Sequence, residues 1–348
     1  MKNDSLTLYS PASTRIRIGV ASSISQGTRE YQEDAFGHWL DASGERLFTV
    51  VADGAGGHGG GAEASQAAIE YSAKAWQKAS AGAISNPEAF LSEWMKGAHL
   101  AVNEASAKIH RSARSVVVAC LTGGGNAHWV HAGDSRLLRF HEGKLVERTR
   151  DDSVVQVLFE RGDITEEEMG THPDQSRLLQ SLGGEDPPRP RLGCSAISAG
   201  DVLILCSDGL WEHLKQEELE ILSATPSAKR QKALDEAVAE AVRRAGPKAD
   251  NTTAVMICFE EDDSDCCSRI RWSLLVLLAA VAGFVAALRW TGANHTIQEL
   301  WKNWGQMTNL SGVPSVSSTQ PESPPGDAAP DTGIPSDEKP LLPEIPHD

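Results

Sequence analysis

The sequence predicts an α+β fold built on antiparallel sheets, and three observations lead to this prediction. Short apolar runs bounded by Gly, Asp or Asn recur along most of the chain, as expected of strands. Longer stretches rich in Ala, Glu, Lys and Leu carry apolar residues at three- and four-residue steps, which is typical of helices. The two kinds of segment do not alternate regularly, and this disfavours a parallel sheet of βαβ units.

The expected elements follow from these patterns in chain order. The apolar runs predict strands at 17–22, 47–52, 115–121, 127–132, 136–140, 201–206 and 252–259. The periodic stretches predict helices at roughly 62–80, 87–112 and 226–245. All of these elements lie before residue 260, where we expect the globular part to end.

Length and charge limit the classes of protein to consider. At 348 residues the chain exceeds what one core usually needs, so we expect one large domain with appendages. Acidic residues outnumber basic ones by 48 to 32, a formal net charge of −16, and no long Lys/Arg cluster is present. Nucleic acid is therefore not an expected partner. The six cysteines show neither metal-binding spacing nor a disulfide framework, which indicates a reducing compartment.

An uncharged apolar stretch follows the expected domain. Residues 273–288 carry no charge, and Trp272 and Trp290 stand at the two ends, where interfacial tryptophans are expected. At about 1.5 Å per residue, this stretch is long enough to cross a bilayer core. We predict a juxtamembrane linker at 261–271 and a transmembrane helix at 272–290. The alternative interpretation is a buried core helix.

The flanks of this stretch indicate its orientation. Arg269 and Arg271 precede the span, a weak positive-inside bias that favours a cytoplasmic N-terminal side. Residues 1–14, the N-terminal arm, lack the apolar core of a signal peptide. We therefore expect a single-pass membrane protein with its domain in the cytoplasm. Residues 291–348 would form a Pro-rich disordered tail on the opposite side, because 311–348 hold nine of the seventeen prolines.

Four aspartates stand where an expected strand begins or ends: Asp53, Asp134, Asp208 and Asp250. A carboxylate at a strand end is held by a rigid element yet faces a loop, so several can converge on one cleft. Hard divalent cations prefer such oxygen ligands, and clustered anions would repel one another without a cation. Each aspartate taken alone is better explained as a turn or cap residue, because Asp-Gly is an ordinary turn dipeptide.

The segments around these aspartates strengthen the interpretation as a metal site. Five motifs occur in order: GTREYQEDAF (27–36), VADGAGGHGGGAEAS (51–65), HAGDSRLLRF (131–140), CSDGLWE (206–212) and ADNTTAVM (249–256). Together they resemble the PPM, or PP2C, family of metal-dependent protein serine/threonine phosphatases of the bacterial type. The resemblance covers about residues 15–260. It implies an α-β-β-α sandwich, in which two antiparallel sheets are flanked by helices.

The resemblance also implies a set of metal ligands. Asp53 would bridge two Mn²⁺ or Mg²⁺ ions, and Glu33 with the carbonyl group of Gly54 would complete the second ion's site. Asp208 and Asp250 would hold the first ion.

Three further roles are implied by the resemblance. Asp34 would orient metal-bound water at the metal centre. Asp134, together with Asp208, would hold the third ion that bacterial relatives bind near the substrate. Arg29 would grip the substrate phosphate, a task that suits the planar fork of donors on a guanidinium group.

The implied reaction is hydrolysis of phosphoserine or phosphothreonine in proteins, within a pathway that includes a cognate Ser/Thr kinase. Two divalent ions would make hydroxide available near neutral pH, so no nucleophilic side chain is needed. His58 could act as general acid, but a structural role is favoured because eukaryotic members place their histidine elsewhere. Cys206 lacks the CxxxxxR loop of cysteine phosphatases, so packing explains it better.

Several positions depart from the family pattern: Gln32, Ala55, Asp152 and the segment 114–116. None of them removes an expected metal ligand. The rival interpretations are a pseudophosphatase that binds phosphoproteins or scaffolds a membrane complex, and a different metal hydrolase or nuclease. The intact carboxylates argue against the first, and the absence of basic patches argues against a nuclease.

Overall fold

The computed structural model describes residues 16–55, 60–261, 277–287 and 294–308 of the chain. These residues belong to two units, Met1–Ser268 and Arg269–Asp348, and each unit is described by itself. The first unit contains both β-sheets, and the described residues of the second unit, 277–287 and 294–308, are helical.

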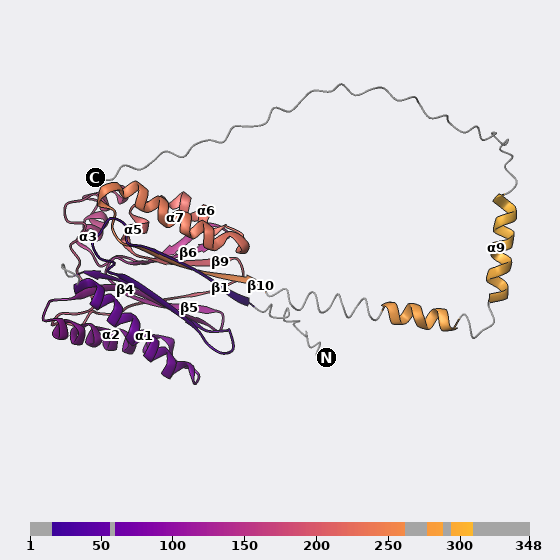
Figure 1. Cartoon of the computed structure of the whole chain (residues 1–348), viewed down its shortest axis with the longest axis horizontal. Coiled ribbons are helices and arrows are strands. Elements are labelled where there is room, and N and C mark those ends of the chain that lie inside the picture. Colours follow the sequence, from indigo (N-terminus) through magenta and orange to yellow (C-terminus); the bar gives the residue numbers. More distant parts are fainter. Residues whose placement is uncertain (1–15, 56–59, 262–276, 288–293, 309–348) are drawn as a thin grey trace, which may run out of the picture. The chain divides into compact units, whose positions relative to one another are not determined.

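Two five-stranded antiparallel sheets form the centre of the first unit (Figure 1). The first sheet has the strand order β1-β10-β9-β6-β7, with bounds Ile16–Ser25, Thr252–Glu261, Asp201–Cys206, Arg136–His141 and Lys144–Arg148. The second has the order β2-β3-β4-β5-β8, with bounds Asp34–Leu40, Leu47–Ala55, Arg114–Gly123, Asn126–Ala132 and Arg191–Ala196.

Helices cover the outer face of each sheet, which gives the expected α-β-β-α layering (Figure 1). Helices α1 (Gly60–Ser80) and α2 (Pro87–Ile109) pack on the second sheet. Helices α5 (Asp208–Trp211), α6 (Gln216–Ser223) and α7 (Arg230–Ala245) belong to the first sheet's side. Helices α3 (Val154–Arg161) and α4 (Glu166–Met169) lie in the segment between β7 and β8. The predicted fold class is confirmed.

Three apolar clusters hold these layers together. The cluster between the sheets includes Val51, Leu205 and Ile257, all fully buried. The cluster under α1 and α2 is rich in aromatic rings, and Phe48 contacts Trp39, Trp76, Phe90 and Trp94. The buried indole of Trp94 donates a 2.9 Å hydrogen bond to Ser72 Oγ, so its polar atom is satisfied inside the cluster.

Every expected strand lies within an observed one, but β2, β7 and β8 were not predicted. All three are edge strands of their sheets. An edge strand is covered less completely than a central one, so its sequence need not be a continuous apolar run. The alternating burial of Arg191–Ala196 in β8 illustrates this, whereas Asp201–Cys206 in the central strand β9 is buried throughout.

The ends of helix α2 follow from local chemistry. Asn86 precedes the helix and its side chain accepts a hydrogen bond from the amide of Ala89, while Pro87 occupies the first turn. At the other end His110 takes a left-handed conformation with φ 53° and stops the helix before residue 112. The third helix begins later than expected, at Arg230 and not at residue 226. A short 3₁₀ turn, η1 (Ser227–Lys229), precedes α7 there.

The second unit contains two described helices, at 277–287 and at Asn294–Thr308 (α9). Within its described residues, no helix has the length and apolar character needed to cross a membrane. The outer parts of the predicted span, 272–276 and 288–290, fall outside the described residues. Helix α9 occupies part of the tail expected to be disordered. Apolar residues at three- and four-residue steps, such as Leu300, Trp301 and Trp304, account for this difference.

The β2–β3 hairpin carries a compact ionic clamp. Asp41 Oδ2 accepts a 2.8 Å hydrogen bond from Arg46 Nε, and Asp41 Oδ1 accepts one of the same length from Ser43 Oγ. The guanidinium of Arg46 also donates to the carbonyl groups of Gly82 and Ser80, just beyond and at the end of α1. Burial alone would raise the pKa of Asp41, but these hydrogen bonds lower it to about 2.

We expect Asp41→Asn to destabilise the first unit by about 2 kcal/mol at pH 7. The pKa of Asp41 is lower in the folded state than in the unfolded state. Its stabilisation is therefore full above the unfolded value near 4 and is lost as the pH falls towards about 2. Urea unfolding of both proteins at pH 7 and pH 3 measures this. Asp163→Asn, at an exposed position, is the control. If Asp41→Asn lowered the free energy of unfolding by the same amount at both pH values, the charge of Asp41 would not be the source of the stabilisation.

Candidate active site

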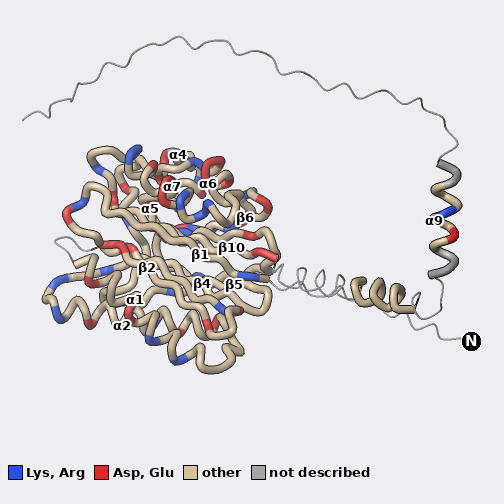
Figure 2. The backbone as a smooth tube through the Cα atoms, turned by 45° about the vertical axis from the view of Figure 1, so that its right-hand side comes forward, with Lys and Arg blue, Asp and Glu red and all other residues tan. Residues whose placement is uncertain are grey.

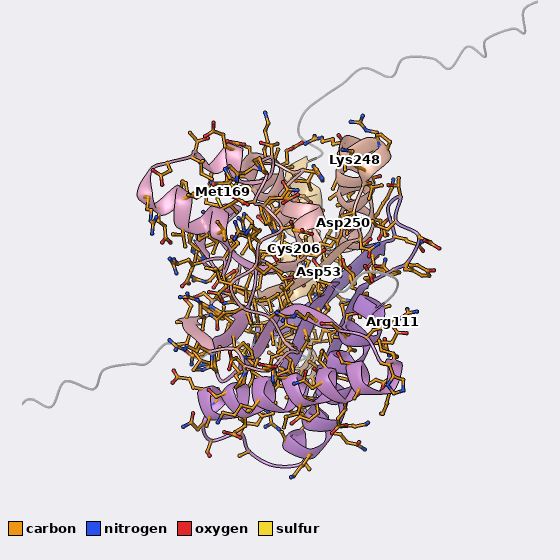
Figure 3. The ribbon with its side chains drawn as sticks, turned by 90° about the vertical axis from the view of Figure 1, so that its left-hand side faces the viewer. Asp53, Arg111, Met169, Cys206, Lys248 and Asp250 are labelled. Atoms are coloured by element: carbon orange, nitrogen blue, oxygen red, sulfur yellow. The ribbon has the colours of Figure 1, made fainter. Side chains whose placement is uncertain are left out.

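Aspartates from both sheets meet at one end of the sandwich. Asp34 and Asp53 are directly opposite each other in the register of β2 and β3. Asp208 begins helix α5 directly after β9, and Asp250 stands just before β10. Figure 3 labels Asp53 and Asp250 near the centre of its view, and the electrostatic interaction of Asp53 with Asp208 and Asp250 places these carboxylates near one another. The structure therefore brings together carboxylates that are far apart in sequence.

Ser207 links the two sheets at this site. Its hydroxyl donates a 2.8 Å hydrogen bond to Asp34 Oδ2 and accepts a 2.9 Å hydrogen bond from the amide of Thr253. Its own amide donates to the Thr253 carbonyl at 3.0 Å. Ser207 is fully buried, so this network fixes the end of β9 against β10 and against Asp34.

Asn251 anchors the loop between β1 and β2, which carries Arg29 and Glu33. Its side-chain oxygen accepts a 2.7 Å hydrogen bond from the amide of Glu33. Its side-chain nitrogen donates to the carbonyl groups of Gln26 at 2.8 Å and Tyr31 at 3.1 Å. One buried amide thus holds three points of the loop, and the adjacent Asp250 is held in place with it.

Asp250 and Glu33, two of the expected metal ligands, contact other groups of the same chain. The guanidinium of Arg29 forms an ion pair with the carboxylate of Asp250. Glu33 Oε1 accepts a hydrogen bond from the amide of Gly61 at 3.1 Å. The Arg29 side chain is 54% exposed and that of Asp250 37%, so this ion pair faces solvent at the mouth of the site.

Gly54 sits where backbone segments approach too closely for any side chain. A Cβ at this position would lie 2.1 Å from the carbonyl oxygen of Gly61 and 2.6 Å from that of Glu33. The amide of Gly54 donates to the Glu33 carbonyl at 3.0 Å. Only glycine permits this approach between β3, the Glu33 loop and the start of α1. His58 lies outside the described residues.

Asp134 is buried and its position depends on a neighbouring glycine. Gly133 has φ 107°, and a Cβ there would lie 2.2 Å from Val116 Cγ1. The carbonyl group of Asp134 accepts a 3.0 Å hydrogen bond from the indole of Trp211. The guanidinium of Arg136 lies 3.4 Å above that indole ring, so both sheets and α5 fix this corner of the site.

The electrostatics of the site follow from burial of like charges. Burial raises the pKa of Asp34 to about 7 and that of Asp208 to about 6, and neighbouring carboxylates contribute to both shifts. Burial followed by repulsion from the other aspartates raises the pKa of Asp53 and of Asp134 well above its usual value. Burial and the nearby Asp208 raise the pKa of Glu212 to about 9. A bound cation would relieve this repulsion.

The donor chemistry fits a hard divalent cation. The expected side-chain donors are carboxylate oxygens, and Asp34 Oδ1 is buried with no hydrogen-bond partner among the described atoms. As the side chains stand, no group of three or more Asp, Glu, His or Cys residues in the described segments is arranged to hold one ion. In this arrangement Asp250 contacts Arg29, and Glu33 contacts the amide of Gly61.

Three of the residues that shape the site escaped the sequence analysis: Ser207, Glu212 and Asn251. All lie inside or beside motifs that were recognised, CSDGLWE and ADNTTAVM. Ser207 and Asn251 each stand next to an aspartate at a strand end, which on sequence alone is also ordinary turn chemistry. Glu212 lies four residues after Asp208, and no local pattern singled it out.

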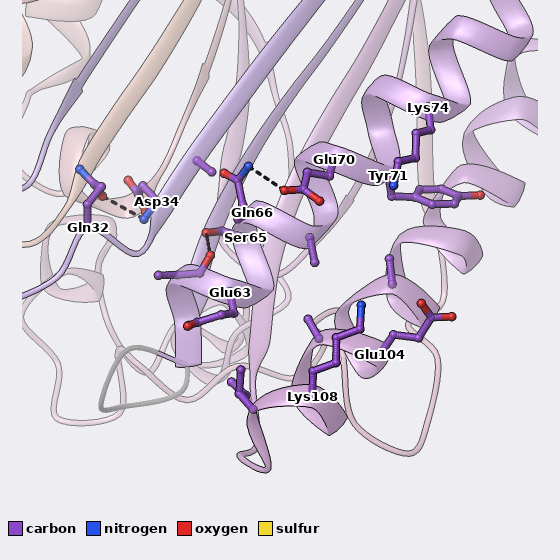
Figure 4. Close-up of a pocket in the computed structure, with 16 residues that line it drawn as sticks. Gln32, Asp34, Glu63, Ser65, Gln66, Glu70, Tyr71, Lys74, Glu104 and Lys108 are labelled. Carbon is purple, nitrogen blue, oxygen red and sulfur yellow. Dashed lines mark hydrogen bonds between the residues drawn. The ribbon is translucent and has the colours of Figure 1, made fainter.

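Two of the residues that depart from the family pattern, Gln32 and Asp152, make defined contacts in the structure. Gln32 Oε1 accepts a 2.9 Å hydrogen bond from the amide of Asp34. Both residues also line a groove of about 700 Å³ beside α1 and α2 (Figure 4). Asp152 is buried and forms an ion pair with Arg191 of β8. Gln32 and Asp152 therefore each make a structural contact of their own.

The fold and the site together define a metal-dependent phosphohydrolase. A family model described as protein phosphatase 2C matches residues 21–249. Protein phosphatase PhpP of Streptococcus pneumoniae is 25% identical over 240 residues, which are 68% of this chain and 95% of that protein.

Solved structures give the same result. The Mycobacterium tuberculosis serine/threonine phosphatase PstP/Ppp is 30% identical with a TM-score of 0.60, covering 70% of this chain and 99% of that one. The catalytic domain of PstP in complex with two manganese ions is 27% identical with a TM-score of 0.59, covering 71% of this chain and all of that one (100%). The chain belongs to the protein phosphatase 2C family. It is a metal-dependent protein serine/threonine phosphatase, as the sequence motifs predicted.

We expect Asn251→Ala to lower kcat/KM for a phosphothreonine peptide by about a hundredfold, because the loop carrying Arg29 and Glu33 loses its three side-chain anchors. The Mn²⁺ concentration for half-maximal activity should rise in the same variant. Phosphate release at a series of Mn²⁺ concentrations measures both effects.

Asn126→Ala is the matched control, since Asn126 is exposed and its side chain donates a 3.1 Å hydrogen bond to the carbonyl group of Gly124 within its own turn. It should leave both quantities unchanged. A variant at position 251 that melts at a lower temperature but keeps the Mn²⁺ dependence would show that Asn251 serves stability alone.

Proposed function

We propose that the chain dephosphorylates phosphoserine and phosphothreonine in proteins through a metal centre held by the aspartates of this site. The convergence of buried carboxylates from both sheets carries the proposal. Asp53 is assigned as the ligand shared by two ions, with Asp208 and Asp250 on one side. Glu33 and the Gly54 carbonyl group are assigned to the other side, and Asp34 orients water.

The identity and number of the ions extend this proposal. Carboxylate and carbonyl oxygens suit both Mn²⁺ and Mg²⁺. Asp134 and Asp208 are assigned to a third ion. The coupling of these two buried carboxylates supports the assignment, because each contributes to the raised pKa at this corner of the site.

Arg29 is assigned to the substrate phosphate. It stands at the exposed mouth of the site, and its present partner is the carboxylate of Asp250. A guanidinium group binds phosphate oxygens with two parallel hydrogen bonds, so Arg29 would exchange one anionic partner for another as substrate arrives. When bound, the metal ions supply an activated water molecule and neutralise charge on the phosphoryl group.

The second unit is assigned to membrane anchoring, with residues 272–290 as a single span and Met1–Ser268 on the cytoplasmic side. The exposed apolar residues of helix 277–287, such as Leu278 at 62% and Phe284 at 66%, support this assignment. An anchored phosphatase of this kind would oppose a cognate Ser/Thr kinase at the membrane, with the tail beyond residue 291 on the opposite side.

Hydrolysis of a phosphothreonine peptide should require Mn²⁺ or Mg²⁺ and stop when a chelator is added. Asp208→Ala should lower kcat/KM by about a thousandfold, since a ligand assigned to two ions is lost. Phosphate release by the full chain measures this, with Asp235→Ala on the exposed face of α7 as control. A folded protein without turnover under either metal would instead favour a pseudophosphatase that binds phosphoproteins.

Membrane anchoring is tested by flotation with phospholipid vesicles. The full chain should float, whereas a chain ending at Ser268 should stay in the soluble fraction and retain metal-dependent activity. A chain lacking only 309–348 is the matched control and should float like the full chain. Equal behaviour of all three proteins would contradict an anchor at 272–290.

A further inference from the structure

A second pocket lies beside the mouth of the site and shares Arg29 with it. Its volume is about 530 Å³. The loop of Thr28 and Arg29 forms one wall, and the 3₁₀ turn η2 (Gly246–Lys248) forms the next. His213, just after α5, and Gln175, in the segment after α4, close it on the other side. The assigned ligand Asp250 lies at the boundary between this pocket and the metal site.

Backbone hydrogen bonds fix the two cationic residues of this pocket relative to each other. The amide of Thr28 donates to the carbonyl group of Ala249 at 3.0 Å. Its hydroxyl lies 3.2 Å from the Pro247 carbonyl oxygen and 3.1 Å from that of Ala249. The residue before Arg29 is thus tied to both neighbours of Lys248. In Figure 3 Lys248 lies farther from Asp53 than Asp250 does, on the same side of the first unit.

The charge distribution of the pocket favours an anion. Lys248 is exposed, and its amino group has no ion-pair or hydrogen-bond partner in the part of the chain that the structure describes. Of the two acidic residues in the wall, Asp250 faces Arg29, and Glu212 packs against Gly170. A free cation beside the phosphate-binding residue therefore faces the pocket in a protein whose net charge is −16.

We propose that this pocket is a second anion subsite, in which Lys248 binds an acidic group on a substrate residue near the phosphorylated one. The proposal rests on the phosphatase function above and adds a substrate class, namely phosphopeptides with a flanking carboxylate or second phosphate. An extended peptide advances about 3.3 Å per residue, so a side chain one to three positions from the phosphoresidue at Arg29 reaches the pocket.

The test compares phosphothreonine peptides that differ at one flanking position. The full chain with Mn²⁺ is given peptides with Glu, phosphoserine, Ala or Lys at each of the three positions on either side. At the best position, Glu should raise kcat/KM about fivefold over Ala, the effect of one exposed ion pair. Phosphoserine should raise it further because it carries more negative charge, and Lys should lower it. Whether the Glu peptide or the phosphoserine peptide gives the higher kcat/KM shows whether the pocket prefers a carboxylate or a second phosphate.

Lys248→Ala should remove this preference while leaving hydrolysis of a small aryl phosphate unchanged. Lys78→Ala is the matched control. Lys78 lies in the last turn of α1, about 25 Å along the helix axis from Gly61, and it should keep the preference. The preference of the wild-type protein should also weaken at high salt, as expected of an exposed ion pair.

The outcomes separate the subsite from the active site. Equal kcat/KM for the Glu, Ala and Lys peptides, with aryl phosphate still hydrolysed, would overturn the subsite alone. A preference for acidic peptides that survives Lys248→Ala would overturn the role of Lys248. Failure of the wild-type protein to hydrolyse aryl phosphate under any metal would overturn the assigned metal centre instead.

Discussion

Mutual repulsion of buried carboxylates is the constraint on which the rest of the structure depends. Asp34 and Asp53 face each other across one sheet, and Asp208 and Asp250 approach them from the other. The raised pKa values of Asp34, Asp53 and Asp208 record the cost of burying these carboxylates close together. A fold that keeps such groups together must hold each one on rigid backbone. Both sheets provide this backbone, because strands of each sheet end at this point.

The neutral residues around the carboxylates are as important as the carboxylates themselves. Ser207 joins β9, β10 and Asp34 through three hydrogen bonds, and Asn251 joins β10 to the loop of Arg29. Both side chains are buried and satisfied inside the protein. Because they carry no charge, they position the anions without adding to the repulsion.

Much of the fold could be predicted from the sequence, because central strands such as β9 and β10 are continuous apolar runs. The edge strands β2, β7 and β8 could not, because their sequences contain no such run, whereas the edge strand β1 does contain one. The residues expected to hold metal were recognised through motifs, and Asp34, Asp53, Asp208 and Asp250 among them lie together, whereas their assigned roles stay predictions. The pairing of Arg29 with Asp250 depends on contacts across 221 positions, which no local pattern reveals.

The position of β10 has a consequence for synthesis of the protein. This strand, Thr252–Glu261, is the last strand among the described residues of the unit, yet it lies inside the first sheet between β1 and β9. Its full length pairs with β1, from Ile16 opposite Glu261 to Ser25 opposite Thr252. A nascent chain released before residue 261 therefore lacks the strand that joins its beginning to its end. Folding of the first sheet must wait until nearly the whole unit has left the ribosome.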